Sequence, residues 1–151
     1  MENGGANSSW ASRIHHIGIV VRDIEKAIEY YESLGIGPFE PLSLKLTDRE
    51  VHGKPADNIR NISMMAQMGP IRFELVQPVS GESVQKEFLE TRGEGVNHLG
   101  FAVDNLEEEV AKLMEKGCTV ISSGKFAEGG GFAYLDTDKV GGVIFDFLEL
   151  P

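Results

Sequence analysis

The stretches IHHIGIVV (residues 14–21) and NHLGFAV (residues 97–103) decide the fold of this chain, because the second repeats the first at a constant offset. His16 and His98 are separated by 98 − 16 = 82 positions. The same offset pairs Gly18 with Gly100, Val21 with Val103 and Ile24 with Leu106. A β-rich pattern that occurs twice indicates two copies of one structural unit.

A helix is predicted after each of these two strands. Residues 24–34 carry apolar side chains at helical spacing, with Asp23 as the N-cap and Gly35 as the residue that ends the helix. Residues 106–117 show the same order in the second half. Each half therefore begins as a strand followed by a helix.

Three further strands are expected after each helix, so that each half is a βαβββ module. They are predicted at residues 39–45, 62–68 and 71–77 in the first half and at residues 119–122, 132–136 and 143–149 in the second. The fold class is therefore α+β. We expect a disordered tail at residues 1–12 and one domain at 13–151, with module one at 13–78, a linker at 82–95 that contains a helix at 82–91, and module two at 96–151.

Composition favours one compact domain and argues against several kinds of partner. Of the 151 residues, 41% are hydrophobic, which suits a single core. No apolar stretch approaches the roughly 20 residues that cross a bilayer, and the polar start lacks a signal peptide, so we expect a cytoplasmic protein with no membrane partner. A net charge of −10 with scattered basic residues disfavours nucleic acid. The single cysteine, Cys118, is expected to be a buried structural thiol rather than a nucleophile.

Strand alternation places the two repeated histidines on one face of the sheet. The opposite, bulky face carries Ile17, Ile19 and Val21 in the first strand and Leu99, Phe101 and Val103 in the second, and it is expected to pack under the helices. His16 and His98 then lie next to small residues, which leave space beside each imidazole. His15 falls on the bulky face and His52 in a polar loop, so neither is expected in the site.

The last strand of each half repeats this pattern with an acid. Phe73 and Leu75 flank Glu74, and Phe145 and Phe147 flank Asp146, while Glu149 points to the other face. A carboxylate between apolar neighbours on a central strand needs a compensating cation. Two imidazoles and two carboxylates suit Zn, Co, Mn, Ni or Fe. Each residue alone has a plainer interpretation, as a hydrogen-bonded histidine or a solvated acid, but their symmetric positions in the repeat favour a divalent metal site.

The chain resembles the vicinal-oxygen-chelate superfamily, which comprises glyoxalases, bleomycin-resistance proteins and extradiol dioxygenases, over nearly all residues after Ser12. Three stretches are most similar to methylmalonyl-CoA epimerases: IHHIGIVVRDIEKAIEYYESLGI, FLETRGEGVNHLGFAVDNLEEEVAKLMEKG and GGVIFDF. The resemblance implies one cupped mixed sheet, built by the two modules around a single divalent metal ion, and a homodimer.

The metal ligands that the resemblance implies are His16, Glu74, His98 and Asp146, with Asp146 at a position where relatives carry glutamate. It also implies proton abstraction next to the carbonyl of methylmalonyl-CoA or a similar acyl-CoA, with Asp146 or Glu74 as one catalytic acid and Asp57 as the second. Asp57 could equally cap its loop. Arg72 shares a strand face with Glu74 and is expected either to bind a substrate carboxylate or phosphate or to be solvated. Residues 46–61 have no confident counterpart in relatives and should form part of the substrate pocket.

Three other functions remain compatible with these residues. A lactoylglutathione-lyase-like isomerase would use the same metal and base but needs a glutathione pocket. A resistance-type protein would bind its ligand without a metal. An extradiol-type dioxygenase holds Fe(II) with two histidines and one carboxylate, so a fourth protein ligand argues against it.

Overall fold

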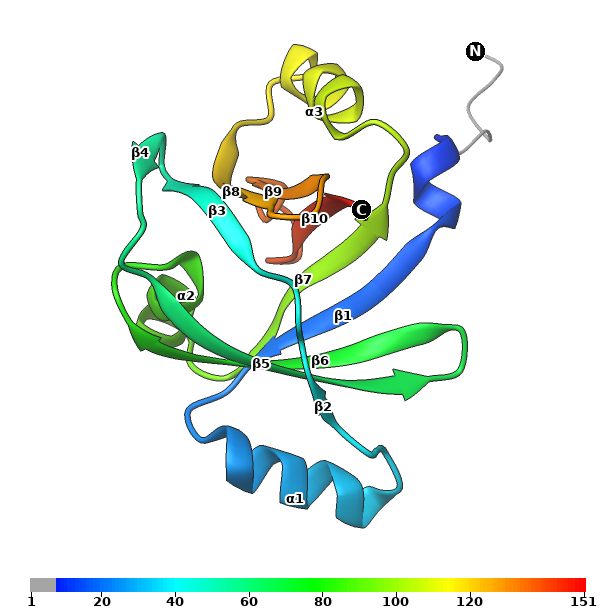
Figure 1. Ribbon diagram of the computed structural model, residues 1–151, viewed down its shortest axis with the longest axis vertical. Coiled ribbons are helices and arrows are strands. Elements are labelled where there is room, and N and C mark those ends of the chain that lie inside the picture. The colour runs from blue at the N-terminus through cyan, green and yellow to red at the C-terminus, as the bar shows by residue number, and fades with distance from the viewer. Residues whose placement is uncertain (1–7) are drawn as a thin grey trace.

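A computed structural model of the protein describes residues 8–151, which form three α-helices around one curled, ten-stranded mixed sheet (Figure 1). The elements in chain order are the 3-10 helix η1 (Ser9–Ser12), β1 (Ile14–Val20), α1 (Ile24–Leu34), β2 (Glu40–Pro41), β3 (Leu46–Val51), β4 (Lys54–Pro55), β5 (Arg60–Met68), β6 (Ile71–Ser80), α2 (Val84–Arg92), β7 (Gly95–Ala102), α3 (Leu106–Glu115), β8 (Val120–Phe126), β9 (Gly131–Leu135) and β10 (Ile144–Glu149). The predicted α+β class with one cupped mixed sheet is confirmed.

The two repeated strands form the centre of the sheet. The strand order is β2-β5-β6-β1-β7-β10-β9-β8-β3-β4, with β1 and β7 antiparallel to each other. β6 pairs with β1 and β10 pairs with β7, both in parallel. In Figure 1, α1 and α3 lie at opposite ends of the molecule, outside the curl of the sheet. The last strands of both modules therefore flank the two histidine-bearing strands.

Capping residues repeat together with the strands. Asp23 caps α1 by accepting a hydrogen bond from the backbone N–H of Lys26, and Gly35 ends the helix with φ of 106°, both as predicted. A side chain from the last strand of each module completes each N-terminus. Gln77 accepts from the Ile24 N–H and Glu149 accepts from the Leu106 N–H, each at 2.8 Å. Glu149 thus lies on the helix side of the sheet, as strand alternation predicted.

The bulky strand faces pack under the helices, as predicted. The cluster around α1 contains Val21, Ile24, Phe39, Ala66, Phe73 and Leu75, with Ile19 packed against it. The cluster around α3 contains Phe101, Val103, Leu135 and Phe147, with Leu99 and Cys118 packed against it. Cys118 is half-buried and makes no disulfide. Burial of these apolar faces leaves the opposite, concave face of the sheet for the polar residues.

The prediction of a strand at residues 39–45 is wrong for most of that segment. Only Glu40–Pro41 pairs there, as the two-residue strand β2, and proline lacks the N–H that a continued ladder would need. The chain then crosses to the other module, where β3 pairs antiparallel with β8 (Figure 1). Residues of module one therefore form part of the cavity wall beside module two.

The predicted disordered tail extends too far. Residues 1–7 lie outside the described residues, but residues 9–12 form η1. The Trp10 ring packs against Phe101, Phe145 and Phe147, with centroid distances of 5.0, 5.8 and 4.8 Å. Burial of this aromatic surface holds the turn against the sheet.

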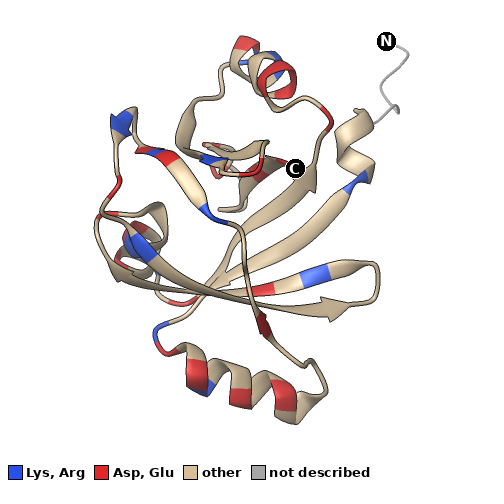
Figure 2. Ribbon diagram, in the orientation of Figure 1, with Lys and Arg blue, Asp and Glu red and all other residues tan. Residues whose placement is uncertain are grey.

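Charge is spread over the outside of the molecule. Figure 2 shows that acidic residues recur along α1 and α3, while Lys and Arg residues are dispersed over the chain. Within residues 8–151, none of the helices combines the length and the apolar character needed to span a membrane.

Candidate metal site

Sheet register brings the four predicted metal ligands onto four adjacent strands. Gly18 of β1 lies between Glu74 of β6 and His98 of β7. Gly100 of β7 lies between His16 of β1 and Asp146 of β10. Laterally paired residues point to the same face of a sheet, so all four polar side chains extend from the concave face.

Three of these side chains form a compact, buried cluster. One ligand atom from each of His16, Glu74 and His98 lies within 4.8 Å of the others. The two histidine Nε2 atoms are 3.1 Å apart, and Glu74 Oε1 is 3.1 Å from His98 Nε2 and 3.6 Å from His16 Nε2. The three residues are at most 6% exposed. Such an N₂O cluster could hold a divalent transition metal.

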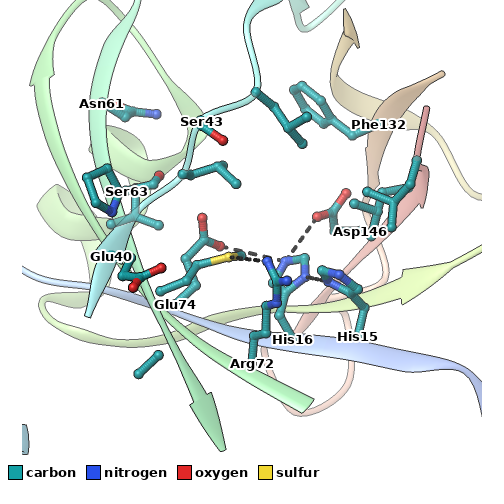
Figure 3. A pocket seen from close by; sticks show the side chains of 18 of the residues that line it. His15, His16, Glu40, Ser43, Asn61, Ser63, Arg72, Glu74, Phe132 and Asp146 are labelled. Carbon is teal, nitrogen blue, oxygen red and sulfur yellow. Dashed lines mark hydrogen bonds and ion pairs between the residues drawn. The ribbon is translucent and has the colours of Figure 1, made fainter. Parts of the chain in front are cut away.

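Asp146 joins the cluster from one side only. Its Oδ2 is 3.3 Å from His16 Nε2, and Figure 3 shows Glu74 and Asp146 on opposite sides of His16. Its Oδ1 is buried and has no hydrogen-bond partner among the described residues. An unpaired buried carboxylate oxygen is costly without a cation or a proton nearby. This orphaned atom, together with the two imidazoles and Glu74, fits a bound divalent ion.

The cluster depends on two glycines that the repeat relates to each other. A Cβ on Gly18 would lie 2.0 Å from Cε1 of His98, and a Cβ on Gly100 would lie 2.0 Å from Cε1 of His16. Each imidazole therefore packs flat over the glycine of the other module. Only glycine at these two positions lets the rings approach the sheet closely enough to meet.

We expect Gly100→Ala to lose the metal and to destabilise the fold, because the new methyl group must displace the His16 ring. Forced overpacking typically costs about 1–3 kcal/mol. Metal content and the free energy of unfolding in urea measure the two effects. Gly69→Ala is the control: Gly69 has φ of 62°, and an added methyl group there would meet no atom within 4 Å, so this variant should lose some stability through backbone strain and keep its metal. Equal metal content in Gly100→Ala and wild type would contradict the role of Gly100 in packing.

Two neighbouring side chains orient the imidazoles. His98 Nδ1 lies 2.9 Å from Asn97 Oδ1, which leaves His98 Nε2 to face the cluster. His16 Nδ1 lies 2.8 Å from His15 Nδ1 in the same manner. The prediction that His15 points away from the site is wrong, since the β1–β7 register shifts between Ile14 and His16 and His15 lines the cavity.

Burial and charge act against each other on these ionisable groups. Burial alone would raise the pKa of Glu74, but the hydrogen bond with His98 and the charge of His16 hold it below the usual value. Burial would lower the pKa of His16, but Asp146 and Glu74 raise it. For Asp146 burial prevails, and its pKa is raised. Burial, with His16 and Arg72 nearby, lowers the pKa of His15 to about 4, so this histidine is neutral at pH 7.

The cluster lies at the base of a cavity of about 650 Å³, a size within the usual range for small-molecule sites. Arg72 lines this cavity, is exposed, and approaches Met65 Sδ at 3.9 Å through Nη1. Asp57 is exposed and lines a separate outer hollow, so the structure does not bring it to the cluster. His52 is also remote and pairs with Glu87 at 2.8 Å.

Several polar residues of the cavity were not predicted from the sequence. Arg49, Asn61, Gln85 and Tyr134 line it together with Glu40. Tyr134 is opposite Asp146 in the β9–β10 ladder, and its hydroxyl is 3.5 Å from His98 Nε2. Burial, together with the nearby Asp146 and Glu74, raises the pKa of Tyr134 well above its usual value, so it stays protonated. A tyrosine within the otherwise apolar stretch GFAYL was the one available sequence signal.

The repeated modules, the single curled sheet and the polar cluster on its concave face define the class of protein to which the chain belongs. A family model described as the glyoxalase/bleomycin resistance protein/dioxygenase superfamily matches residues 15–134, and the chain belongs to this superfamily. The mitochondrial methylmalonyl-CoA epimerase of Bos taurus is 29% identical over 150 residues, covering 96% of this chain and 79% of that protein. An uncharacterized protein of Bacillus subtilis (strain 168) is 26% identical over 140 residues, covering 91% and 92%.

A solved structure has the same architecture. Methylmalonyl-CoA epimerase from Mycobacterium tuberculosis aligns with a TM-score of 0.65 at 22% identity, over 97% of this chain and 93% of that one. This likeness shows the fold. The chain is thus related to methylmalonyl-CoA epimerases at low identity.

Proposed function

We propose that the protein is a metal-dependent epimerase or isomerase that moves a proton next to the carbonyl of an acyl-CoA, with methylmalonyl-CoA as the first substrate to test. The observation that carries the proposal is the buried His16–Glu74–His98 cluster with the unpaired Asp146 oxygen beside it, at the base of a cavity. The 29% identity to the bovine epimerase supports the substrate class.

His16, Glu74 and His98 would hold the divalent ion, because their ligand atoms converge. When bound, such an ion acts as a Lewis acid that stabilises negative charge on a carbonyl oxygen while the neighbouring proton leaves. The Tyr134 hydroxyl, which stays protonated, lies close enough to His98 to donate to the same oxygen. The apolar wall that includes Phe126 and Phe132 limits access of water to the bottom of the cavity, where the cluster lies.

Epimerisation needs one proton-moving group on each side of the substrate carbon. Asp146 Oδ1 is the first, since it is buried, unpaired and at the cavity wall. Glu40 replaces Asp57 as the second, because Glu40 lines the cavity and Asp57 does not. Glu40 lies on β2 and Asp146 on β10, on the two arms of the curled sheet, and Figure 3 shows them on different sides of His16.

Arg72 would bind a phosphate or carboxylate of the substrate at the edge of the cavity. It is exposed and forms no ion pair among residues 8–151. A cavity of about 650 Å³ accommodates the acyl end of a thioester, and the nucleotide end would extend past Arg72. The homodimer and the cytoplasmic location that were expected from the sequence stay predictions.

Incubation with methylmalonyl-CoA in D₂O tests the reaction. The metal-loaded protein should place deuterium at the α-carbon, and inversion should proceed together with labelling because two different acids exchange the proton. Mass spectrometry follows the label, and a stereospecific coupled assay follows inversion. Glu40→Gln should retain exchange of one epimer while it loses inversion. Protein stripped of metal with EDTA should neither incorporate deuterium nor invert the substrate.

Two outcomes would replace this proposal. Absence of exchange and inversion on a panel of acyl-CoA thioesters, with turnover of a glutathione hemithioacetal, would favour a lactoylglutathione-lyase-like isomerase. Tight binding of an aromatic or drug-like ligand by a metal-free, inactive protein would favour a resistance-type binding protein.

One observation favours a second candidate. The compact cluster has two histidines and one carboxylate, the ligand set of non-haem Fe(II) dioxygenases, while the Asp146 carboxylate pairs with His16 alone among the described residues. An extradiol-type dioxygenase would consume O₂ when the Fe(II)-loaded protein is given a catechol. Oxygen uptake without proton exchange on acyl-CoA substrates would support this candidate instead.

A further inference from the structure

One wall of the cavity carries a half-buried arginine that the proposed reaction does not use, and this arginine also borders the outer hollow that Asp57 lines. Arg49 extends from β3, lines the cavity, and has an Nε atom that is buried without a hydrogen-bond partner among the described residues. No ion pair of this arginine occurs within residues 8–151, and burial lowers the pKa of its guanidinium. A guanidinium that loses water without gaining a carboxylate is costly, so it is suited to receive an anion.

The local backbone is irregular where it carries Arg49. The β3–β8 ladder shifts register between Thr47 and Glu50, and Asp48 has φ of 49°, which is unusual for a residue other than glycine. Bulges of this kind redirect a side chain at binding sites, and the strained conformation needs support from the surrounding structure. Arg49 therefore lies in the segment of β3 where regular pairing with β8 is interrupted.

Polar side chains connect Arg49 to the metal site. With the Asn61 amide turned so that Oδ1 faces Arg49, the guanidinium Nη2 donates to it at 3.3 Å. In the other orientation of this amide, Asn61 Nδ2 donates to Gln85 Oε1 at 3.2 Å. Gln85 Nε2 donates to the Tyr134 hydroxyl at 3.1 Å, and that hydroxyl lies 3.5 Å from His98 Nε2. Three side chains thus separate the cation from the cluster. A single small ligand could contact both Arg49 and the cluster only if several atoms separate its anionic group from its reacting carbonyl.

We propose that Arg49 binds a substrate carboxylate that is separate from the oxygens at the metal site. The substrate class is then a carbonyl compound with a second, more distant acidic group, such as the thioester of a dicarboxylic acid longer than malonate. Glu74 and Asp146 offset a divalent ion, so Arg49 makes this part of the cavity positive although the chain carries a net charge of −10. The carbonyl end of this substrate rests on the proposed function, whereas the binding of a carboxylate by Arg49 is independent of it.

Calorimetric titration of metal-free protein with succinate tests the site, because removal of the metal leaves two cavity arginines, Arg49 and Arg72, as anion receptors, and variants of Arg49 separate its share from that of Arg72. Succinate should bind wild type, and its uncharged diamide should not. Arg49→Met should weaken succinate binding at least about tenfold, the scale of one charged hydrogen-bonded contact. Arg49→Lys should be intermediate, since lysine keeps the charge but cannot form the forked contact. Arg60→Met is the control, because Arg60 is exposed on β5 and does not line the cavity.

Unchanged succinate affinity in Arg49→Met and Arg49→Lys would overturn the proposal. So would tighter binding of inorganic phosphate than of succinate, if that binding also disappears in Arg49→Met, because the site would then recognise a phosphate. Circular dichroism checks that both variants fold. If Arg49→Met does not fold, the succinate affinity of Arg49→Lys alone decides the test. Succinate binding through Arg49 in a protein that exchanges no proton in D₂O would keep this inference and reject the proposed function. Proton exchange in D₂O, together with unaltered succinate binding in the Arg49 variants, would keep the proposed function and reject this inference.

Discussion

His98→Ala is expected to reduce bound metal from about one ion per chain to near zero, and to reduce proton exchange at least about 10³-fold, because a Lewis acid contributes several kcal/mol to such a reaction. His98 is fully buried, contacts His16 and Glu74 at 3.1 Å, and has its ring held by Asn97. Metal analysis of protein purified without chelator measures the first effect. The D₂O assay measures the second.

The thermal midpoint separates loss of metal from loss of packing. A ligand that binds only the folded state raises the midpoint, so EDTA should lower it in wild type and leave it unchanged in His98→Ala. His52→Ala is the matched control, since His52 is exposed and pairs with Glu87 away from the cavity. It should keep the metal, the activity and the response to EDTA. Full metal occupancy in His98→Ala would refute the site.

Asp146→Asn is expected to lose inversion by roughly 10²- to 10⁴-fold, the usual contribution of a general acid or base, while it keeps much of its metal. The three-residue cluster does not include Asp146, so the metal should depend mainly on the other ligands. Asp146→Glu should retain both metal and part of the activity, because it keeps a carboxylate at this position on a side chain one methylene longer. Measurement of metal content beside the inversion rate separates a proton-moving role from a ligand role.

Glu149→Gln provides the control on the same strand. Glu149 lies three residues after Asp146, on the helix side, where it accepts a hydrogen bond from the Leu106 N–H, and a glutamine oxygen can accept the same bond. Metal and activity should be unchanged. Loss of metal in Glu149→Gln together with a silent Asp146→Asn would show that the concave face of β10 is misassigned by an odd number of residues.

The pattern of the sequence was sufficient to predict both the fold class and the polar cluster. The 82-residue offset between His16 and His98 relates two strands that pair antiparallel at the centre of the sheet. Alternation along each strand is a local property of the backbone, so it placed Glu74 and Asp146 on the histidine face and Glu149 on the other before any long-range contact was known. For this reason four residues distant in the sequence could be assigned to one face.

Tertiary structure decided which other residues reach that face. Arg49 enters the cavity because β3 crosses to pair with β8, and Asp57 stays outside for the same reason. His15 joins the site through a shift in the β1–β7 register, which strand alternation cannot foresee. Strand pairing between distant segments and irregularities in register depend on the whole sheet rather than on neighbouring residues. The local pattern therefore determined which residues form the polar cluster, and the closure of the sheet determined what surrounds it.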